Sequence, residues 1–302
     1  MHNYIDFERQ IQVLCTLQKD FDLSQISTIH TGGRARYYAV AYTTTVLQKI
    51  IKQCINHGIK YMLVGNCSNI LFLDTQYDGL VISTKHLNKI IVSHNIITAQ
   101  AGAMLGQVAY LAGQCGLSGL EWSVGIPATV GGAVVMNAGA YDGDVKGVLY
   151  SARVLDINMG KIITLKNVEY LAQHHKSLFT NNNNYVIMSV SFKLSYSNKN
   201  DVLTRTRQIL LLRHQQQNVR FPSLGSVFCR GDSNYPPAYM IDKSNLKGFA
   251  VGGAMISPKH AGFIVNTGSA TSNDVLQLID CVKTRIKQQW GVLLQTEIII
   301  GE

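Results

Sequence analysis

The sequence predicts an α+β fold made of two regions, and three observations support this prediction. The chain has 302 residues, which is enough for two domains at about 150 residues per domain. Through the first hundred residues, segments with helical spacing of apolar residues alternate with short apolar runs that are typical of strands. Beyond a polar stretch near residue 200, the same mixture returns in a smaller C-terminal region.

The N-terminal region contains both kinds of element. Apolar residues at helical spacing predict helices over residues 5–19 and 46–54, and the second of these ends at Gly58, a common helix stop. A third helical stripe runs from Leu105 to Cys115. Short apolar runs bounded by Gly, Asn, Asp or Ser predict strands at residues 61–64, 80–82, 90–92 and 96–99.

The C-terminal elements follow a predicted domain boundary. Residues 185–194 alternate apolar and polar side chains, the period of a half-buried strand. The polar segment at residues 195–201 is then the expected boundary. Helices are predicted from Val202 and over residues 272–289, and a final buried strand over 297–300, which makes the C-terminal unit a smaller α+β domain.

Charge and composition narrow the classes of partner. The chain carries 27 Lys and Arg against 18 Asp and Glu, a net charge of +9, and an excess of this kind suits an anionic partner. The basic residues are dispersed and form no polybasic run, so a phosphorylated small molecule is favoured over nucleic acid. We therefore expect no nucleic-acid partner.

Cysteine spacing and apolar segments exclude other classes. The six cysteines show no CxxC spacing, so we expect no metal site and no dense disulfide framework, only reduced thiols that are mostly buried. The polar N-terminus does not resemble a signal peptide. No apolar segment reaches the roughly 18 to 20 residues of a membrane span. These features predict a cytoplasmic protein without a membrane partner.

Two glycine-rich segments are the strongest candidates for ligand contact. The turn Gly65-Asn-Cys-Ser-Asn69 follows a predicted strand and offers backbone N–H groups to an anion, although an ordinary turn would look the same. Residues 116–141 are rich in glycine and small residues, so their backbone can approach a ligand closely, or a neighbouring helix. GxGxxG and GxxxxGK[ST] loops are absent, which excludes the commonest dinucleotide and triphosphate motifs.

The order of residues in the second segment adds a family resemblance. It reads Gly116-Leu-Ser-Gly-Leu-Glu121, Gly125-Ile-Pro-Ala-Thr-Val-Gly-Gly-Ala133 and Met136-Asn-Ala-Gly-Ala-Tyr141. These blocks strongly resemble the UDP-N-acetylenolpyruvylglucosamine reductases, flavoenzymes of peptidoglycan synthesis, with Ala128 in place of a glycine. The similarity spans about residues 28 to 300 and includes residues 65–69, 222–228, 246–248, 252–254, 257–266 and 296–297.

The resemblance implies a fold and a reaction. The fold would be the vanillyl-alcohol-oxidase type of FAD-binding fold: an N-terminal helix over residues 1–25, an FAD-binding domain over 26–197 that is split into two subdomains near residue 85, and a substrate domain over 201–302. The length is similar to the shorter second subtype of the family. The implied cofactors are non-covalent FAD and NADPH, the implied substrate is an enolpyruvyl UDP-sugar, and we expect a monomer.

The resemblance also assigns roles to residues. Ser226 occupies the position of the proton donor to the substrate α-carbon, and Glu297 that of the glutamate near the substrate carboxylate. The implied FAD-binding residues are Gly65, Asn66, Cys67, Ser68, Asn69, Gly125, Ile126, Thr129, Gly132 and Ala133. The implied substrate-binding residues are Tyr141, Arg213, Arg230, Lys259 and His260.

The chain departs from the family at ligand-facing positions. The family's Tyr-Arg-x-Ser reads His174-His-Lys-Ser177 here, so His175 replaces the arginine that steadies the developing enolate, unless Lys176 has taken that role. The family's Gly-Gly-Gly-Ser-Asn turn has Asn66 and Cys67. Asparagine tolerates a left-handed backbone, whereas a cysteine is harder to accommodate there. Retention of Ser226 and Glu297 favours an active reductase, whereas the substitution at His175 favours the alternative, a divergent flavin-binding paralogue with lost or altered activity.

Overall fold

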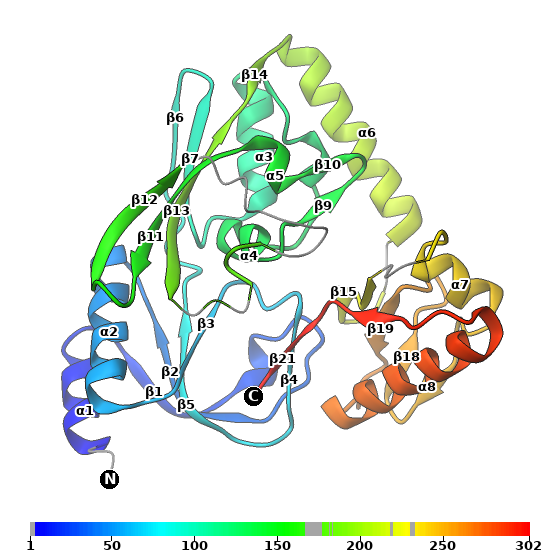
Figure 1. Cartoon of the computed structure of the whole chain (residues 1–302), viewed down its shortest axis with the longest axis horizontal. Coiled ribbons are helices and arrows are strands. Elements are labelled where there is room, and N and C mark those ends of the chain that lie inside the picture. The colour runs from blue at the N-terminus through cyan, green and yellow to red at the C-terminus, as the bar shows by residue number, and fades with distance from the viewer. Residues whose placement is uncertain (1–3, 167–176, 181, 183, 218–219, 230–232) are drawn as a thin grey trace. The chain divides into compact units, whose positions relative to one another are not determined.

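The computed structural model describes residues 4–166, 177–180, 182, 184–217, 220–229 and 233–302. The chain divides into two compact units that do not follow chain order. Unit 1 comprises residues 1–19, 37–66 and 79–212, and unit 2 comprises residues 20–36, 67–78 and 213–302. Figure 1 shows the elements along the chain.

Unit 1 contains a five-stranded antiparallel sheet with the order β12-β11-β13-β7-β6. Its strands are β6 (Ile90–Ser93), β7 (Ile96–Gln100), β11 (Leu149–Asp156), β12 (Lys161–Lys166) and β13 (Tyr185–Lys193). Helices α3 (Leu105–Gln114) and α4 (Val130–Val135) share one buried apolar core with β7 and β13. Short elements also belong to this part: β8 (Leu117–Ser118) pairs with β14 (Ser195–Tyr196), and the hairpin β9 (Gly139–Ala140) and β10 (Gly143–Asp144) precedes α5 (Val145–Val148).

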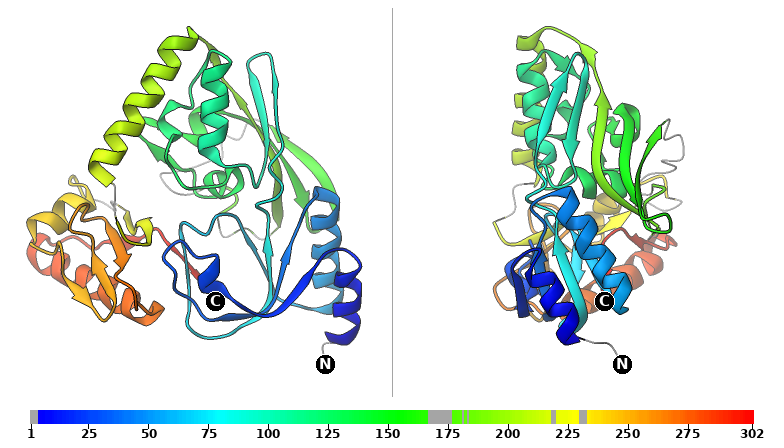
Figure 2. Two further views of the ribbon diagram at one scale, coloured as in Figure 1. Left: turned by 180° about the vertical axis from the view of Figure 1, so that it is seen from behind. Right: turned by 90° about the vertical axis from the view of Figure 1, so that its left-hand side faces the viewer.

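A second sheet has the order β1-β2-β5-β3. Its strands are β1 (Leu17–Asp22), β2 (Arg34–Val40), β3 (Tyr61–Val64) and β5 (Tyr77–Ser83), of which β1, β2 and β5 pass from one unit into the other along the chain. In unit 1, β3 runs parallel to β5, with Val64 opposite Ser83. Helices α1 (Tyr4–Gln12) and α2 (Thr44–His57) lie side by side in the two views of Figure 2 and share a core with these strands.

Local sequence explains the ends of α2. The Thr43 side chain accepts a hydrogen bond from the backbone N–H of Val46, and Gly58 ends the helix in the left-handed conformation at φ 64°. The predicted stop at Gly58 is therefore confirmed. The helix predicted over residues 5–19 is wrong in length, because α1 ends at Gln12 and Leu17 begins β1 instead.

The buried apolar residues of unit 2 form a core of their own. Four antiparallel strands have the order β15-β19-β18-β17: β15 (Ser223–Ser226), β17 (Ala250–Val251), β18 (Ala254–Ile256) and β19 (Phe263–Asn266). Two strand pairs lie beside them: β16 (Phe228–Cys229) with β20 (Gln295–Thr296), and β4 (Ile70–Phe72) with β21 (Ile299–Gly301). The helices are α7 (Pro237–Lys243) and α8 (Ser272–Trp290), and α6 (Lys199–Gln217) enters this unit at its last turns.

Polar side chains fix the beginning of α8 in unit 2. Thr271 and Asp274 form a capping box, and the two carboxylate oxygens of Asp74 accept the backbone N–H groups of Ser272 and Asn273 at 3.0 and 3.3 Å. The cysteines differ from expectation, since Cys54 and Cys67 are buried but the other four are half-buried or exposed.

Candidate functional site

The two glycine-rich segments predicted from the sequence lie against each other in unit 1. Gly65 directly follows β3, and a Cβ atom at this position would lie only 2.2 Å from Thr129 Oγ1. The Asn66 side chain donates a hydrogen bond from Nδ2 to the carbonyl oxygen of Pro127, 2.7 Å away. Glycine is therefore required at position 65, because any side chain would push the two segments apart.

The second segment is held to the rest of unit 1 by its backbone. The N–H of Val130 donates to the carbonyl oxygen of Ala103, and the N–H of Gly131 donates to that of Ala101, both at 2.8 Å. Thr129 is the N-cap residue of α4, the short helix that follows. The position of this segment is thus set by regular hydrogen bonding.

The implied FAD-binding residues of this segment divide into two groups. Thr129 and Ala133 are buried in the protein, and Ile126 packs against the same core. Gly125 and Gly132 are exposed, and Gly125 has a left-handed backbone at φ 77°. The exposed backbone at the two glycines can approach a ligand. Thr129, Ala133 and Ile126 instead face the interior of the protein and hold the segment in place.

Cys67 carries the strained backbone of the turn. Its φ is 54° and its side chain is buried, whereas the sequence suggested Asn66 as the residue suited to a left-handed conformation. The left-handed region costs a residue with a Cβ atom about 1–2 kcal/mol. Position 67 therefore has a left-handed backbone although it is occupied by cysteine rather than glycine.

In unit 2, Thr28 and Asn69 connect the end of this turn to the segments that bear the implied catalytic residues. Thr28 Oγ1 lies 2.8 Å from the carbonyl oxygen of Ser223 in β15 and 3.4 Å from that of Cys67. Asn69 Nδ2 donates to the carbonyl oxygen of Glu297 at 2.9 Å. Asn69 is therefore bonded directly to the segment of Glu297, and Thr28 lies between Cys67 and the strand that ends at Ser226.

Ser226 and Glu297 lie on neighbouring segments of unit 2. Ser226 ends β15, is exposed, and is paired with Phe263 of β19. The next residue, Val227, accepts a hydrogen bond from the backbone N–H of Glu297 at 2.9 Å. The backbone thus places the implied proton donor and the implied carboxylate one residue apart across a hydrogen bond.

The carboxyl group of Glu297 is buried although the residue as a whole is partly exposed. Its Oε2 atom is shielded from solvent, and burial raises the pKa of the carboxyl from 4.5 to about 8. The expected final strand over residues 297–300 is wrong in extent, since Glu297 lies between β20 and β21 and Ile299 is exposed. A carboxyl with this pKa is largely protonated at neutral pH.

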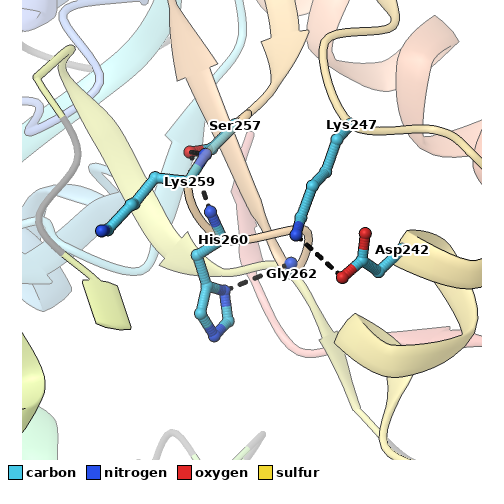
Figure 3. Close-up of polar contacts among 6 residues, drawn as sticks. All are labelled: Asp242, Lys247, Ser257, Lys259, His260 and Gly262. Carbon is cyan, nitrogen blue, oxygen red and sulfur yellow. Dashed lines mark hydrogen bonds and ion pairs between the residues drawn. The ribbon is translucent and has the colours of Figure 1, made fainter. Parts of the chain in front are cut away.

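His260 occupies a tight turn beside Ser226's partner strand (Figure 3). Ser257 Oγ accepts the backbone N–H groups of Lys259 and His260 at 3.2 and 3.3 Å, and the ring packs on Phe263 with 4.6 Å between centroids. His260 Nδ1 accepts a hydrogen bond from the backbone N–H of Gly262 at 3.3 Å. The neutral ring therefore carries its proton on Nε2.

Charge and burial keep this histidine neutral. Burial, and secondly the positive charge of Lys247, lower the pKa of His260 below its usual value. Lys247 is itself paired with Asp242, 2.8 Å from Nζ to Oδ2. Lys259 is exposed, so it presents a positive charge next to a neutral donor.

The remaining implied residues belong to different units. Arg213 lies near the end of α6 in unit 2, where Nη1 donates to Gln217 Oε1 at 3.0 Å. Tyr141 belongs to unit 1 and has a left-handed backbone in the β9–β10 turn. His175 and Arg230 lie outside the described residues.

Within the ranges that the structure describes, no three His, Cys, Asp or Glu side chains are grouped closely enough to hold a metal ion. In the same part of the chain, every helix is too short or too polar to cross a lipid bilayer.

Two family descriptions match this chain. Residues 35–166 match the FAD binding domain family, and residues 216–301 match the C-terminal domain of UDP-N-acetylenolpyruvoylglucosamine reductase. The first region contains both glycine-rich segments, including Gly65 and Asn66. The second region contains Ser226, His260 and Glu297.

Relatives cover almost the whole chain. The UDP-N-acetylenolpyruvoylglucosamine reductase of Caldicellulosiruptor bescii is 39% identical over 287 residues, covering 94% of this chain and 90% of its own length. That of Lactobacillus helveticus is also 39% identical and covers 95% of both chains.

Solved structures agree with the sequence matches. The structure of UDP-N-acetylenolpyruvylglucosamine reductase from Thermus caldophilus has a TM-score of 0.78 at 29% identity and covers 95% of this chain and 99% of its own. A glucose dehydrogenase, Phl p 4.0202, has a TM-score of 0.50 at 12% identity over 64% of this chain and 44% of its own, which concerns the fold alone. The α+β fold of the vanillyl-alcohol-oxidase type is thereby confirmed. By full-length similarity to these relatives, this chain belongs to the UDP-N-acetylenolpyruvoylglucosamine reductase family.

Proposed function

We propose that this protein reduces UDP-N-acetylenolpyruvoylglucosamine to UDP-N-acetylmuramate, with FAD as cofactor and NADPH as hydride source, in peptidoglycan precursor synthesis. The observation that carries the proposal is the pair in unit 2. An exposed Ser226 lies one residue from the hydrogen bond that positions Glu297, whose buried carboxyl has a pKa of about 8. The activity in the names of the relatives needs an acid of this kind beside the substrate.

The residues of unit 1 fit FAD. Gly125 and Gly132 expose backbone that carries no side chain, and Gly65 lies so close to Thr129 that no Cβ atom fits, which suits the close approach of a pyrophosphate. Gly65 and Asn66 begin the turn and Cys67, Ser68 and Asn69 complete it along the chain. Bound there, FAD would supply hydride transfer from NADPH to the β-carbon of the enolpyruvyl group.

Ser226 and Glu297 serve the second half of the reaction. The added hydride leaves an electron pair on the α-carbon, conjugated with the carboxylate, and a proton must be delivered there. We assign this proton to Ser226 Oγ, which is exposed and can recover a proton from solvent. The protonated Glu297 carboxyl donates a hydrogen bond to the developing enolate, which stabilises its charge.

Binding of the substrate anions is assigned to basic and polar side chains. Lys259 offers a charge and His260 a neutral Nε2–H donor to the diphosphate of the UDP-sugar, and Arg213 and Tyr141 complete the set within the described residues. Arg230 and His175 belong to the same assignment on the sequence alone. We further propose that the enzyme acts as a monomer in the cytoplasm, without a nucleic-acid or membrane partner.

Stopped-flow absorbance of the two half-reactions tests the proposal. In Ser226→Ala, NADPH should reduce the flavin at the parent rate, whereas reoxidation by the enolpyruvyl substrate should slow by about 10²- to 10⁴-fold, the usual contribution of a general acid. Ser223→Ala, three residues earlier in β15, is the matched control and should leave both rates near those of the parent.

Two outcomes would contradict this assignment. Equal slowing of both half-reactions in Ser226→Ala would mean that the substitution disturbs the flavin site rather than proton delivery. A parent protein that takes up FAD and is reduced by NADPH but is never reoxidised by the substrate would favour the alternative, a flavin-binding paralogue whose reductase activity has been lost or altered.

A further inference from the structure

An exposed aromatic pair in unit 1 has no role in the assignments above. Tyr42 follows β2 and is 59% exposed, and its ring contacts that of His86 with 4.8 Å between centroids at an angle of 43°. His86 is also exposed and lies in the turn that follows β5. Large apolar surface left in water at a defined place is a common mark of a binding site.

The pair lies at the same edge of the sheet as the beginning of the Gly65 turn. The backbone N–H of Ala41 donates to the carbonyl oxygen of Ser83 at 3.0 Å, which joins the ends of β2 and β5. On the other side, both the N–H and the hydroxyl of Thr84 donate to the carbonyl oxygen of Val64, at 2.9 and 3.0 Å. Tyr42, His86 and Gly65 each follow one of these joined strand ends.

Strand spacing gives the separation of the two features. The strands stand in the order β2-β5-β3, and neighbouring strands are about 4.8 Å apart. The residues that follow β2 are thus two strand spacings, about 10 Å, from the residues that follow β3. One ribose and its base extend over a similar length from a pyrophosphate, and ligands of parallel sheets bind beyond the carboxyl ends of the strands.

We propose that Tyr42 and His86 form a stacking platform for the adenine ring of FAD. The inference rests on the proposed flavin site, in which Gly65 and Asn66 begin the pyrophosphate turn. Purine rings stack well on aromatic side chains, and a base placed on Tyr42 would cover apolar surface that is now in water. The assignments above give the adenine no partner.

The backbone at both residues of the platform is anchored by hydrogen bonds of their neighbours. Tyr42 lies between Ala41, which is fixed to β5, and Thr43, the N-cap of α2. His86 lies in a turn closed by a hydrogen bond of 2.8 Å from the N–H of Leu87 to the carbonyl oxygen of Thr84. Rings on an anchored backbone have less conformational entropy to lose when a base stacks on them, which favours binding.

The test compares two flavins on the apoprotein. FMN contains the isoalloxazine ring and one phosphate but no adenine, so the platform affects only FAD. Dissociation constants are measured by flavin fluorescence after removal of bound cofactor. In Tyr42→Ala, the constant for FAD should rise about tenfold, within the range known for loss of one base–aromatic stack, whereas the constant for FMN should stay within twofold of the parent.

Control variants keep the test specific. Tyr42→Phe retains the ring and should restore FAD binding to nearly the parent value. Tyr110→Ala removes a similarly exposed tyrosine, 54% exposed on α3, and should leave both constants unchanged. Unchanged FMN binding in Tyr42→Ala also shows that this variant is folded.

Four outcomes would overturn the inference. FAD binding that is unaffected by Tyr42→Ala would remove the platform, and equal weakening of FAD and FMN would mean that Tyr42 supports the fold of the turn instead. Weaker NADPH binding with unchanged FAD binding would assign the pair to the nicotinamide nucleotide. A parent apoprotein that binds neither flavin would contradict the proposed flavin site itself, and the platform with it.

Discussion

Replacing Glu297 with glutamine should change how stability depends on pH. The pKa of this carboxyl rises from 4.5 to about 8 on folding because it is buried. Between these two pH values the unfolded chain has lost the proton and the folded protein keeps it, so stability falls by about 1.4 kcal/mol per pH unit. Over the whole interval this sums to on the order of 3–5 kcal/mol, since partial exposure of the residue reduces the full effect.

Glu297→Gln is nearly isosteric and has no proton to lose, so it removes this dependence. The two proteins should be about equally stable near pH 4.5, and the variant should become progressively more stable up to pH 8, with no further change in the difference above it. Urea denaturation of both apoproteins at pH 5, 7 and 9 measures the difference. A constant difference in the free energy of unfolding at all three values would refute the assignment of a raised pKa to Glu297.

The same pKa should be visible in the reaction. The protonated carboxyl stabilises the enolate, so substrate-driven flavin oxidation by the parent should slow as pH rises through about 8. In Glu297→Gln this limb should be absent, because an amide donates a hydrogen bond at every pH. If the rate of flavin oxidation falls around the same pH at which the stability difference levels off, both effects are assigned to the Glu297 carboxyl.

Substitutions at Cys67, Thr28 and His175 give three further predictions. Cys67→Gly should be about 1 kcal/mol more stable than Cys67→Ala in urea denaturation, the reverse of the usual order, because φ at this position is 54°; equal stabilities would mean that the turn carries no such strain. Thr28→Val should lose about 1–3 kcal/mol and Thr28→Ser much less, because the valine leaves the buried carbonyl oxygen of Ser223 without its donor; similar losses would indicate packing instead. His175→Ala should slow flavin oxidation by substrate and His175→Arg should restore it, whereas a large effect of Lys176→Ala alone would give that role to the lysine.

Long elements with a regular apolar period could be predicted from the sequence. Residues 46–54 became the middle of α2, residues 185–194 became β13, and residues 272–289 became α8 within one residue at its end. The helix predicted from residue 5 to 19 failed because Leu17 pairs in a sheet, and strand pairing overrides a local helical pattern. Short strands such as β20 and β21 have too few residues to show any period.

The candidate site was predictable where it depends on backbone and not where it depends on distant contacts. Gly65 and the segment around Gly125 could be identified because close approach needs glycine. Their contact through Asn66 and Pro127 joins residues 61 positions apart, and spacing in the sequence gives no indication of it. Thr28 and the pair Tyr42 and His86 were missed, since single polar or aromatic residues acquire meaning only from the strand ends beside them.

The fate of solvent hydrogen in the product tests the central claim most directly. The enzyme is incubated with the enolpyruvyl UDP-sugar and NADPH in D₂O, and deuterium in the product is located by NMR. A solvent-derived deuterium is expected at the α-carbon, delivered through Ser226; the β-carbon takes the hydrogen of flavin N5, which comes from NADPH but exchanges with solvent in the reduced flavin. Deuterium at the β-carbon alone, or no reduced product while NADPH still reduces the flavin, would contradict this expectation.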